Sequence, residues 1–157
     1  RTWLTWMGRP GHPWVEDYNM PIRCTVQPGI RRVHCVVEGD ISTEEITGTI
    51  LGIVEDPEFG PGFEILSDHT RIGEPINRAQ VGEMVSLLGS HREKIKDARL
   101  AVVVAKPASL GMMNMLAVLA GDLFREVQVF GTVEQAEQWL RDSRQENRDD
   151  RSGARPA

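Results

Sequence analysis

The longest apolar region of the chain covers residues 100–123 and consists of two parts. Residues 100–105 form a short run rich in β-branched side chains, and after Lys106-Pro107 a segment rich in Met and Leu follows at 110–123. A strand that is apolar on both faces has to be covered on both faces, as happens in the middle of an α/β sheet. We therefore expect residues 100–105 to form a strand between two helical layers.

Upstream, apolar and polar positions alternate in a way that predicts a β-hairpin. Residues 22–27 and 32–38 alternate on either side of a Pro28-Gly29 turn. The register that puts their apolar side chains on one face also places Cys24 opposite Cys35. That pairing allows a disulfide if the Cβ geometry suits one. We expect two buried thiols instead, because a reducing cytoplasm disfavours the bond.

The rest of the pattern alternates short strands with amphipathic helices. Strands are predicted at 63–67 and 127–130, and a loop at 68–76. Residues that can cap a helix N-terminus mark the starts of four helices: Ser42 with Glu45, Asn77, Ser109, and Thr132 with Gln135.

This order, ββαβαβαβα, predicts a single α/β domain with a mixed, mostly parallel five-stranded sheet. The domain is expected at residues 21–140. Residues 1–20 lack a clean period and are interpreted as a flexible extension. Residues 141–157 carry many charges and no large apolar side chain, so we expect a disordered tail.

Composition narrows the classes of function. A net charge of −5 repels phosphate backbones, so we expect no nucleic-acid partner. No apolar run is long enough to span a membrane and no secretory signal is seen, so we expect a cytoplasmic protein that is not integral to a membrane. The four His residues are scattered and no nucleotide-binding motif is present, so no metal site and no cofactor are predicted.

Candidate binding residues gather in the segments that follow the predicted strands. In open α/β sheets, ligands bind at the carboxyl ends of the strands, where loops meet helix N-termini. Two cations and several capped helix starts at this edge predict a site for an anion or a phosphorylated side chain. Capping and local ion pairs explain many of the same residues without a ligand. The candidates are Asp68, His69, Thr70, Arg71, Lys106, Ser109 and Met112.

Three other interpretations remain open. Asp68 beside His69 is a candidate acid–base pair for a small hydrolase, although adjacent residues of an extended segment point opposite ways. The segment 110–123 is apolar nearly all round, which indicates a second contact beyond the core, either a neighbouring helix or a homodimer partner. A small apolar ligand, such as a lipid, could also bind under this helix with loop 57–62 as a lid.

Several of these segments, taken in order, resemble SpoIIAA-like proteins of the STAS (anti-sigma factor antagonist) fold, which is likened to CRAL-TRIO lipid-binding domains. The resemblance covers about residues 22–140 and rests on the order and spacing of loose motifs. These are Gly39-Asp40-Ile41-Ser42-Thr43-Glu44-Glu45 after a hairpin, a strand ending in Asp68, Arg99–Val103 leading to Leu110-Gly111-Met112, and Val129-Phe130-Gly131-Thr132 followed by Trp139-Leu140.

The resemblance implies a bacterial, non-enzymatic regulatory module that binds a protein partner or a small, lipid-like ligand. Anti-sigma factor antagonists are switched by phosphorylation of Ser or Thr in a D-S-S-G type turn. Residues 68–73 depart from that motif, and Thr70 is the hydroxyl that this segment offers. The resemblance therefore implies Thr70 as the candidate phosphorylation site.

Overall fold

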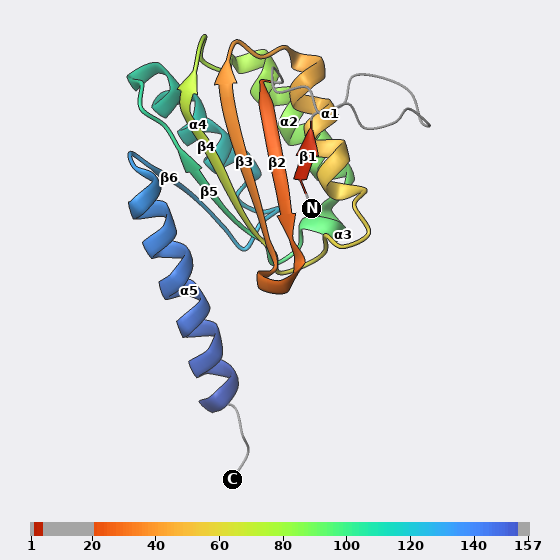
Figure 1. The fold of residues 1–157 in the computed structure, drawn as a ribbon, viewed down its shortest axis with the longest axis vertical. Coiled ribbons are helices and arrows are strands. Elements are labelled where there is room, and N and C mark those ends of the chain that lie inside the picture. The colour runs from red at the N-terminus through yellow and green to blue at the C-terminus, as the bar shows by residue number, and fades with distance from the viewer. Residues whose placement is uncertain (1, 5–20, 154–157) are drawn as a thin grey trace.

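The structure, a computed structural model, describes residues 2–4 and 21–153. These residues form a six-stranded sheet in the order β1-β2-β3-β4-β5-β6, with helices on both faces (Figure 1). The strands are β1 Thr2–Leu4, β2 Ile22–Gln27, β3 Arg32–Gly39, β4 Glu64–Ile72, β5 Arg99–Val103 and β6 Glu126–Phe130. The helices are α1 Thr43–Val54, α2 Arg78–Ser90, α3 Arg92–Ile95, α4 Pro107–Ala120 and α5 Val133–Gly153, and a 3-10 turn, Pro28–Ile30, joins β2 to β3.

The predicted single α/β domain with a mixed, mostly parallel sheet is confirmed. Strands β2 and β3 pair antiparallel, and β3 through β6 are parallel neighbours. All five expected strands are present, and β1 adds another at the edge by pairing antiparallel with β2. The expected flexible extension is therefore wrong for residues 2–4, while residues 5–20 lie outside the described part of the chain.

The order of the parallel strands places the helices. Because β3 to β6 follow one another across the sheet, right-handed crossovers put α1, α2 and α4 on the same face. Helix α5 follows the last strand and packs on the opposite face. Figure 1 shows α1, α2 and α4 overlapping the sheet, whereas α5 extends from the end of β6 past the border of the sheet.

Strand β5 is buried along its whole length, as the apolar run predicted. Leu100 and Val102 pack in the large core beneath α1, α2 and α4. Ala101 and Val103 point the other way and join a smaller cluster with Leu66 of β4 and Ala136 and Leu140 of α5. The expected strand between two helical layers is thus confirmed.

Three of the four predicted helix starts are in place. In α1 the Glu45 N–H donates to Ser42 Oγ at 3.1 Å and the Ser42 N–H donates to Glu45 Oε2 at 2.7 Å, which completes a capping box. Asn77 and Gln80 form the same pair at α2, and the Gln135 N–H donates to Thr132 Oγ1 at α5.

The predicted cap at Ser109 is wrong. Helix α4 begins at Pro107, after Lys106, and Ser109 lies in the first turn of the helix with its side chain buried. Proline suits the first helical position because its φ is already helical and its missing N–H is not needed there. The Pro107 signal therefore sets the start of α4, two residues before Ser109.

The predicted disordered tail is also wrong for residues 141–153, which continue α5. Charges hold this helix where apolar side chains are lacking. Arg32 of β3 lies 3.1 Å from a Glu64 carboxylate oxygen and 2.8 Å from Glu137 of α5. Arg144 of α5 forms an ion pair with Glu64 at 2.6 Å. Residues 154–157 lie outside the described part of the chain.

The hairpin register is confirmed, with Cys24 opposite Cys35. The expectation of two thiols is wrong, because the two sulfurs form a disulfide with the Cα atoms 4.1 Å apart. Close pairs of facing residues on antiparallel strands bring their Cβ atoms within reach of such a bond. Both side chains point into the large core, so the disulfide links β2 and β3 from the buried side of the hairpin.

We predict that reduction of Cys24–Cys35 destabilises the protein by about 3 kcal/mol, because the bond closes a short loop in the unfolded chain. Thermal unfolding with and without dithiothreitol measures the difference. A Cys24→Ala/Cys35→Ala variant should unfold at the same temperature under both conditions. Two free thiols per chain, titrated in guanidinium before any reductant is added, would contradict the bond.

Candidate functional site

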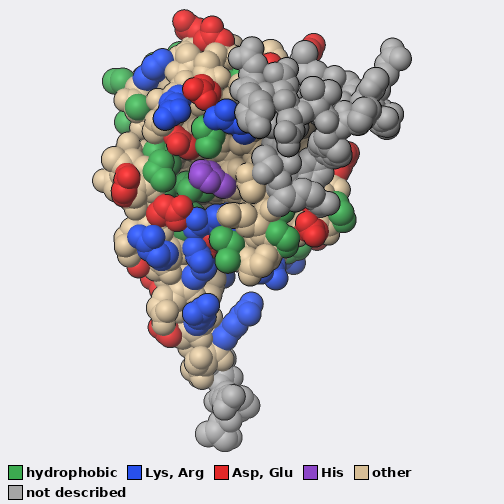
Figure 2. Space-filling model, viewed as in Figure 1, with side chains coloured by type: hydrophobic (Ala, Val, Ile, Leu, Met, Phe, Trp, Pro, Cys, Tyr) green, Lys and Arg blue, Asp and Glu red, His purple; other side chains and the backbone are tan. Residues whose placement is uncertain are grey.

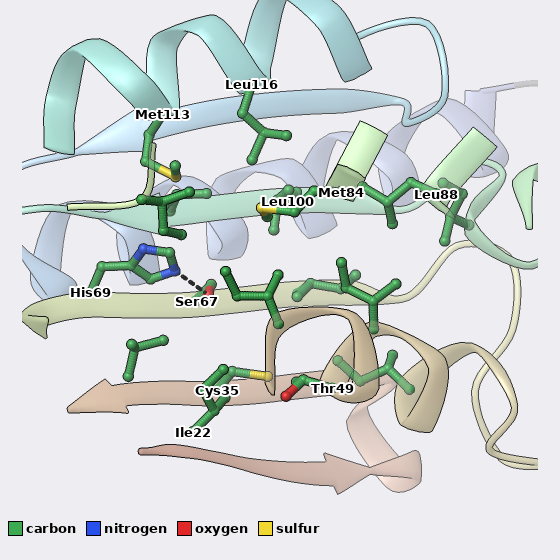
Figure 3. Close-up of a pocket in the computed structure, with 18 of the residues that line it drawn as sticks. Ile22, Cys35, Thr49, Ser67, His69, Met84, Leu88, Leu100, Met113 and Leu116 are labelled. Carbon is green, nitrogen blue, oxygen red and sulfur yellow. Dashed lines mark hydrogen bonds between the residues drawn. The ribbon is translucent and has the colours of Figure 1, made fainter. Parts of the chain in front are cut away.

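A cavity of about 110 Å³ lies between the sheet and the layer of α1, α2 and α4. Its walls are almost entirely apolar. Figure 3 shows side chains from strands and helices pointing into it from opposite sides. The described residues that line it are Ile22, Cys35, Val37, Ile41, Ile46, Thr49, Ile50, Ile53, Val54, Phe59, Ile65, Ser67, His69, Ile76, Met84, Leu88, Ile95, Leu100, Val102, Met113, Leu116 and Phe124.

Among these described lining residues, none is Lys, Arg, Asp or Glu. Three carry a side-chain hydroxyl or imidazole: Thr49, Ser67 and His69. Thr49 Oγ1 donates to the Glu45 carbonyl one turn earlier in α1, at 2.7 Å. Its hydroxyl proton is therefore engaged within α1. The polar groups that face the cavity with donor or acceptor capacity are mainly those of Ser67 and His69.

Ser67 and His69 form a hydrogen-bonded pair at the cavity wall. Both lie on β4, two residues apart, so their side chains leave the strand on the same face. Ser67 Oγ is 2.8 Å from His69 Nε2 (Figure 3). The pair lies toward one end of the cavity, near Met113, and Leu88 lies toward the other end.

Burial keeps the His69 imidazole neutral. The side chain is 5% exposed, and loss of solvent lowers its pKa from 6.5 to about 4, against the opposing attraction of the Asp68 charge. A neutral imidazole has one N–H and one acceptor nitrogen. At neutral pH the pair therefore presents hydrogen-bonding groups to an apolar cavity without a net charge.

The sequence missed this pair because β4 is longer than predicted. The strand continues to Ile72, whereas a loop was expected from residue 68. The pairing with β3 continues as far as Ile72 through a register shift, in which two residues of β4, His69 and Thr70, lie opposite the single residue Val37 of β3. The alternation Ile65-Ser67-His69 is the signal that could have placed both polar side chains on the inner face.

Asp68 and His69 lie on opposite faces of β4. Asp68 is the register partner of Val103, whose side chain packs on the α5 side, whereas His69 lines the cavity. Asp68 Oδ1 accepts the Thr70 N–H at 2.9 Å. The acid–base pair considered for a hydrolase therefore does not form.

The other predicted site residues are divided among different surroundings. Thr70 is half-buried on β4, and Arg71 is exposed with a guanidinium nitrogen 3.8 Å from Glu38. Lys106 Nζ donates to the carbonyl oxygens of Ile72 and Gly73 at 2.9 and 2.5 Å, so it fastens the end of β4.

The last two candidates, Ser109 and Met112, lie on α4. Ser109 is buried, and Met112 packs against the large core. The structure thus places His69 in the cavity and distributes the remaining candidates elsewhere.

The outer side of α4 exposes Leu110, Val118 and Leu119. The helix carries no charged residue between Pro107 and Ala120. These side chains fit the expected second contact of this segment, and a homodimer through residues 110–123 stays a prediction. On the face seen in Figure 2, by contrast, Lys and Arg side chains are intermixed with Asp and Glu.

Comparison with solved structures identifies the architecture. The chain superposes with a TM-score of 0.51 on the crystal structure of an uncharacterized protein of the DUF3478 family with a SpoIIAA-like fold, from Shewanella loihica PV-4. The match covers 81% of this chain and 99% of that one at 14% sequence identity. The fold is SpoIIAA-like. At this identity the likeness shows the fold alone, which confirms the resemblance seen in the sequence.

No family model matches the chain, and a search of curated proteins found no match either. Within the described residues of this SpoIIAA-like domain, no cluster of three or more His, Cys, Asp or Glu side chains could hold a metal ion. No helix in the same part of the chain is long and apolar enough to cross a membrane.

We predict that His69 makes the protein less stable in mild acid. Its pKa is about 4 in the folded state and 6.5 in the unfolded state, so between these values the unfolded chain takes up the proton and the native state does not. The free energy of unfolding should fall by about 3 kcal/mol from this residue as pH drops from 6.5 to 4.

Urea titrations at several pH values, on the native protein and on His69→Leu, isolate this contribution. The stability of the native protein relative to His69→Leu should fall as the pH drops, because only the native protein loses stability through this group. Parallel curves across the whole range would show that His69 has the same pKa in the folded and the unfolded state, and would contradict the prediction.

Proposed function

We propose that this SpoIIAA-like domain is a non-enzymatic binding module that takes up a small apolar ligand in the cavity between its sheet and its helices. The cavity is the observation that carries the proposal. It is formed by side chains of four strands and of α1, α2 and α4, so a bound molecule would contact both layers of the domain. A carrier role would require only that the ligand is held in the cavity. A regulatory role would follow from the ligand's effect on how the sheet and the helices pack.

The size and lining of the cavity support an apolar occupant. Its volume of about 110 Å³ is of the order of an engineered apolar cavity, about 150 Å³, that stays dry and binds benzene. A water molecule needs two to four polar partners, and the described lining offers side-chain polar groups only at Ser67, His69 and Thr49. An apolar molecule therefore gains more from this cavity than water does.

The edge of the sheet supports an anion less well. Lys106, which would attract a negative charge there, is engaged with two backbone carbonyls. Arg71 faces solvent near Glu38. Phosphorylation of Thr70 would add charge next to Asp68 on the same strand. These contacts favour the cavity over the carboxyl edge of the sheet as the binding site. Modification of Thr70 stays a prediction.

The chemistry of the pair on β4 favours binding over catalysis. A general base works best when its pKa lies near the working pH. Burial lowers the pKa of His69 to about 4, which makes the imidazole a weak base for activating Ser67 at neutral pH.

The loop 57–62, which is expected to act as a lid, contributes one side chain to the cavity. Phe59 of this loop is buried and forms part of the cavity wall.

We predict that the native protein binds toluene and that Met84→Trp does not. Met84 of α2 points into the cavity (Figure 3), and the larger indole would occupy the volume that a ligand needs. Isothermal titration calorimetry or ligand-observed NMR measures the binding. Thermal unfolding of the same variant shows whether its fold is retained.

The matched control is Ser86→Trp, which adds the same side chain to an exposed position of the same helix. This variant should bind toluene as the native protein does. Absence of binding to the native protein, or equal binding to Met84→Trp and Ser86→Trp, would contradict the proposal.

A further inference from the structure

We infer that the ligand of this cavity is a neutral amphiphile with one hydroxyl group, which bonds to the Ser67–His69 pair while its apolar body fills the rest of the cavity. The inference rests on the proposed function and adds the chemical class of the ligand. Three features of the structure support it: the hydrogen-bonding capacity left over in the pair, the absence of charged side chains among the described residues that line the cavity, and the position of the pair toward one end of the cavity.

The pair has hydrogen-bonding capacity to spare. A serine hydroxyl has one proton and two acceptor lone pairs, and the contact with His69 Nε2 at 2.8 Å uses one of these. If Ser67 donates to Nε2, its oxygen is left to accept a proton from a ligand. If Nε2–H donates to Ser67, the serine proton is left to be donated.

A ligand hydroxyl fits both arrangements because it is donor and acceptor at once. At the serine, a ketone or ether oxygen fits only the second arrangement, and a hydrocarbon fits neither. Both Ser67 and His69 line the cavity, so the remaining capacity of the serine is within reach of its contents. A hydroxyl group is therefore the partner that this pair accepts in either protonation arrangement.

The surroundings of the pair exclude an anion. Among the described lining residues there is no Lys or Arg to balance a carboxylate or phosphate. Taking an ionised group from water into such surroundings is costly unless a counter-charge meets it. The His69 imidazole supplies none at neutral pH, because burial lowers its pKa to about 4.

The cavity also has a direction. Ser67 and His69 lie toward one end, while Met84 and Leu88 lie beyond Leu100 toward the other (Figure 3). The remaining hydroxyl among the described lining residues, on Thr49, donates its proton to the Glu45 carbonyl of its own helix. A molecule with one polar end and one apolar body thus matches the distribution of groups, with the hydroxyl at the β4 end.

The test compares phenol, toluene and benzoate, which have similar ring sizes and differ in the substituent. Isothermal titration calorimetry at pH 7.5 should show phenol binding to the native protein about five-fold more tightly than toluene, the gain typical of one net hydrogen bond. Benzoate should show no binding at the same concentrations.

A Ser67→Ala/His69→Leu variant removes both members of the pair and leaves no unpaired polar group behind. It should bind toluene with unchanged affinity and lose the preference for phenol. The matched control is Thr49→Val, which removes a polar lining group whose proton is already engaged. This control should retain the five-fold preference of the native protein.

The outcomes separate the inference from the proposed function. Toluene binding as tight as phenol binding, benzoate binding, or a phenol preference that survives in the double variant would overturn the inference and leave the apolar cavity site standing. If the native protein bound neither toluene nor phenol, the proposed function would fall and the inference with it.

Discussion

The parallel ladder from β3 to β6 runs in sequence order, and this order governs where everything else in the domain lies. Right-handed crossovers between successive parallel strands place α1, α2 and α4 on the same face of the sheet. These three helices and the short α3 bury a deep apolar layer over one face, and a single helix, α5, remains for the other face. Strand β5 lies between both layers and is buried throughout. The cavity lies in the thicker layer, beneath three helices that belong to three separate crossovers.

The opposite face is held in another way. Helix α5 contributes few apolar side chains beyond Leu140, and its continuation is fixed by Glu64, which meets Arg32 from the sheet and Arg144 from the helix. A buried carboxylate needs such partners, because an unpaired charge away from water is costly. Glu64 of β4 therefore orients α5. Ser67 and His69 of the same strand lie on its other face and line the cavity.

Much of this architecture could be predicted from local patterns. The hairpin register, the capping boxes and the buried strand at 100–105 follow from periodicity and from side-chain chemistry within a few residues. The full length of β4 could not be predicted, because it depends on a register shift between β3 and β4 that only their pairing reveals. The helical continuation of 141–153 escaped prediction for a similar reason, since Glu64 and Arg144 are far apart in sequence.

The candidate site shows the same limit. The sequence predicts His69 as a site residue but places it in a loop beside Asp68, and it does not indicate Ser67 as the partner of His69. Once residues 64–72 are known to be one strand, alternation puts Ser67 and His69 on one face and Asp68 on the other. The disulfide was also missed, because a sequence register brings Cys24 and Cys35 together without deciding their oxidation state.

The central claim is that the domain keeps an apolar cavity beneath α1, α2 and α4. Diffraction from a crystal pressurised with xenon tests it most directly, because xenon enters apolar cavities and scatters strongly. The account predicts a xenon atom between β4 and the helices, in contact with Met84, Leu100 and Met113. A cavity filled by ordered water molecules, or helices collapsed onto the sheet with no room for xenon, would contradict it.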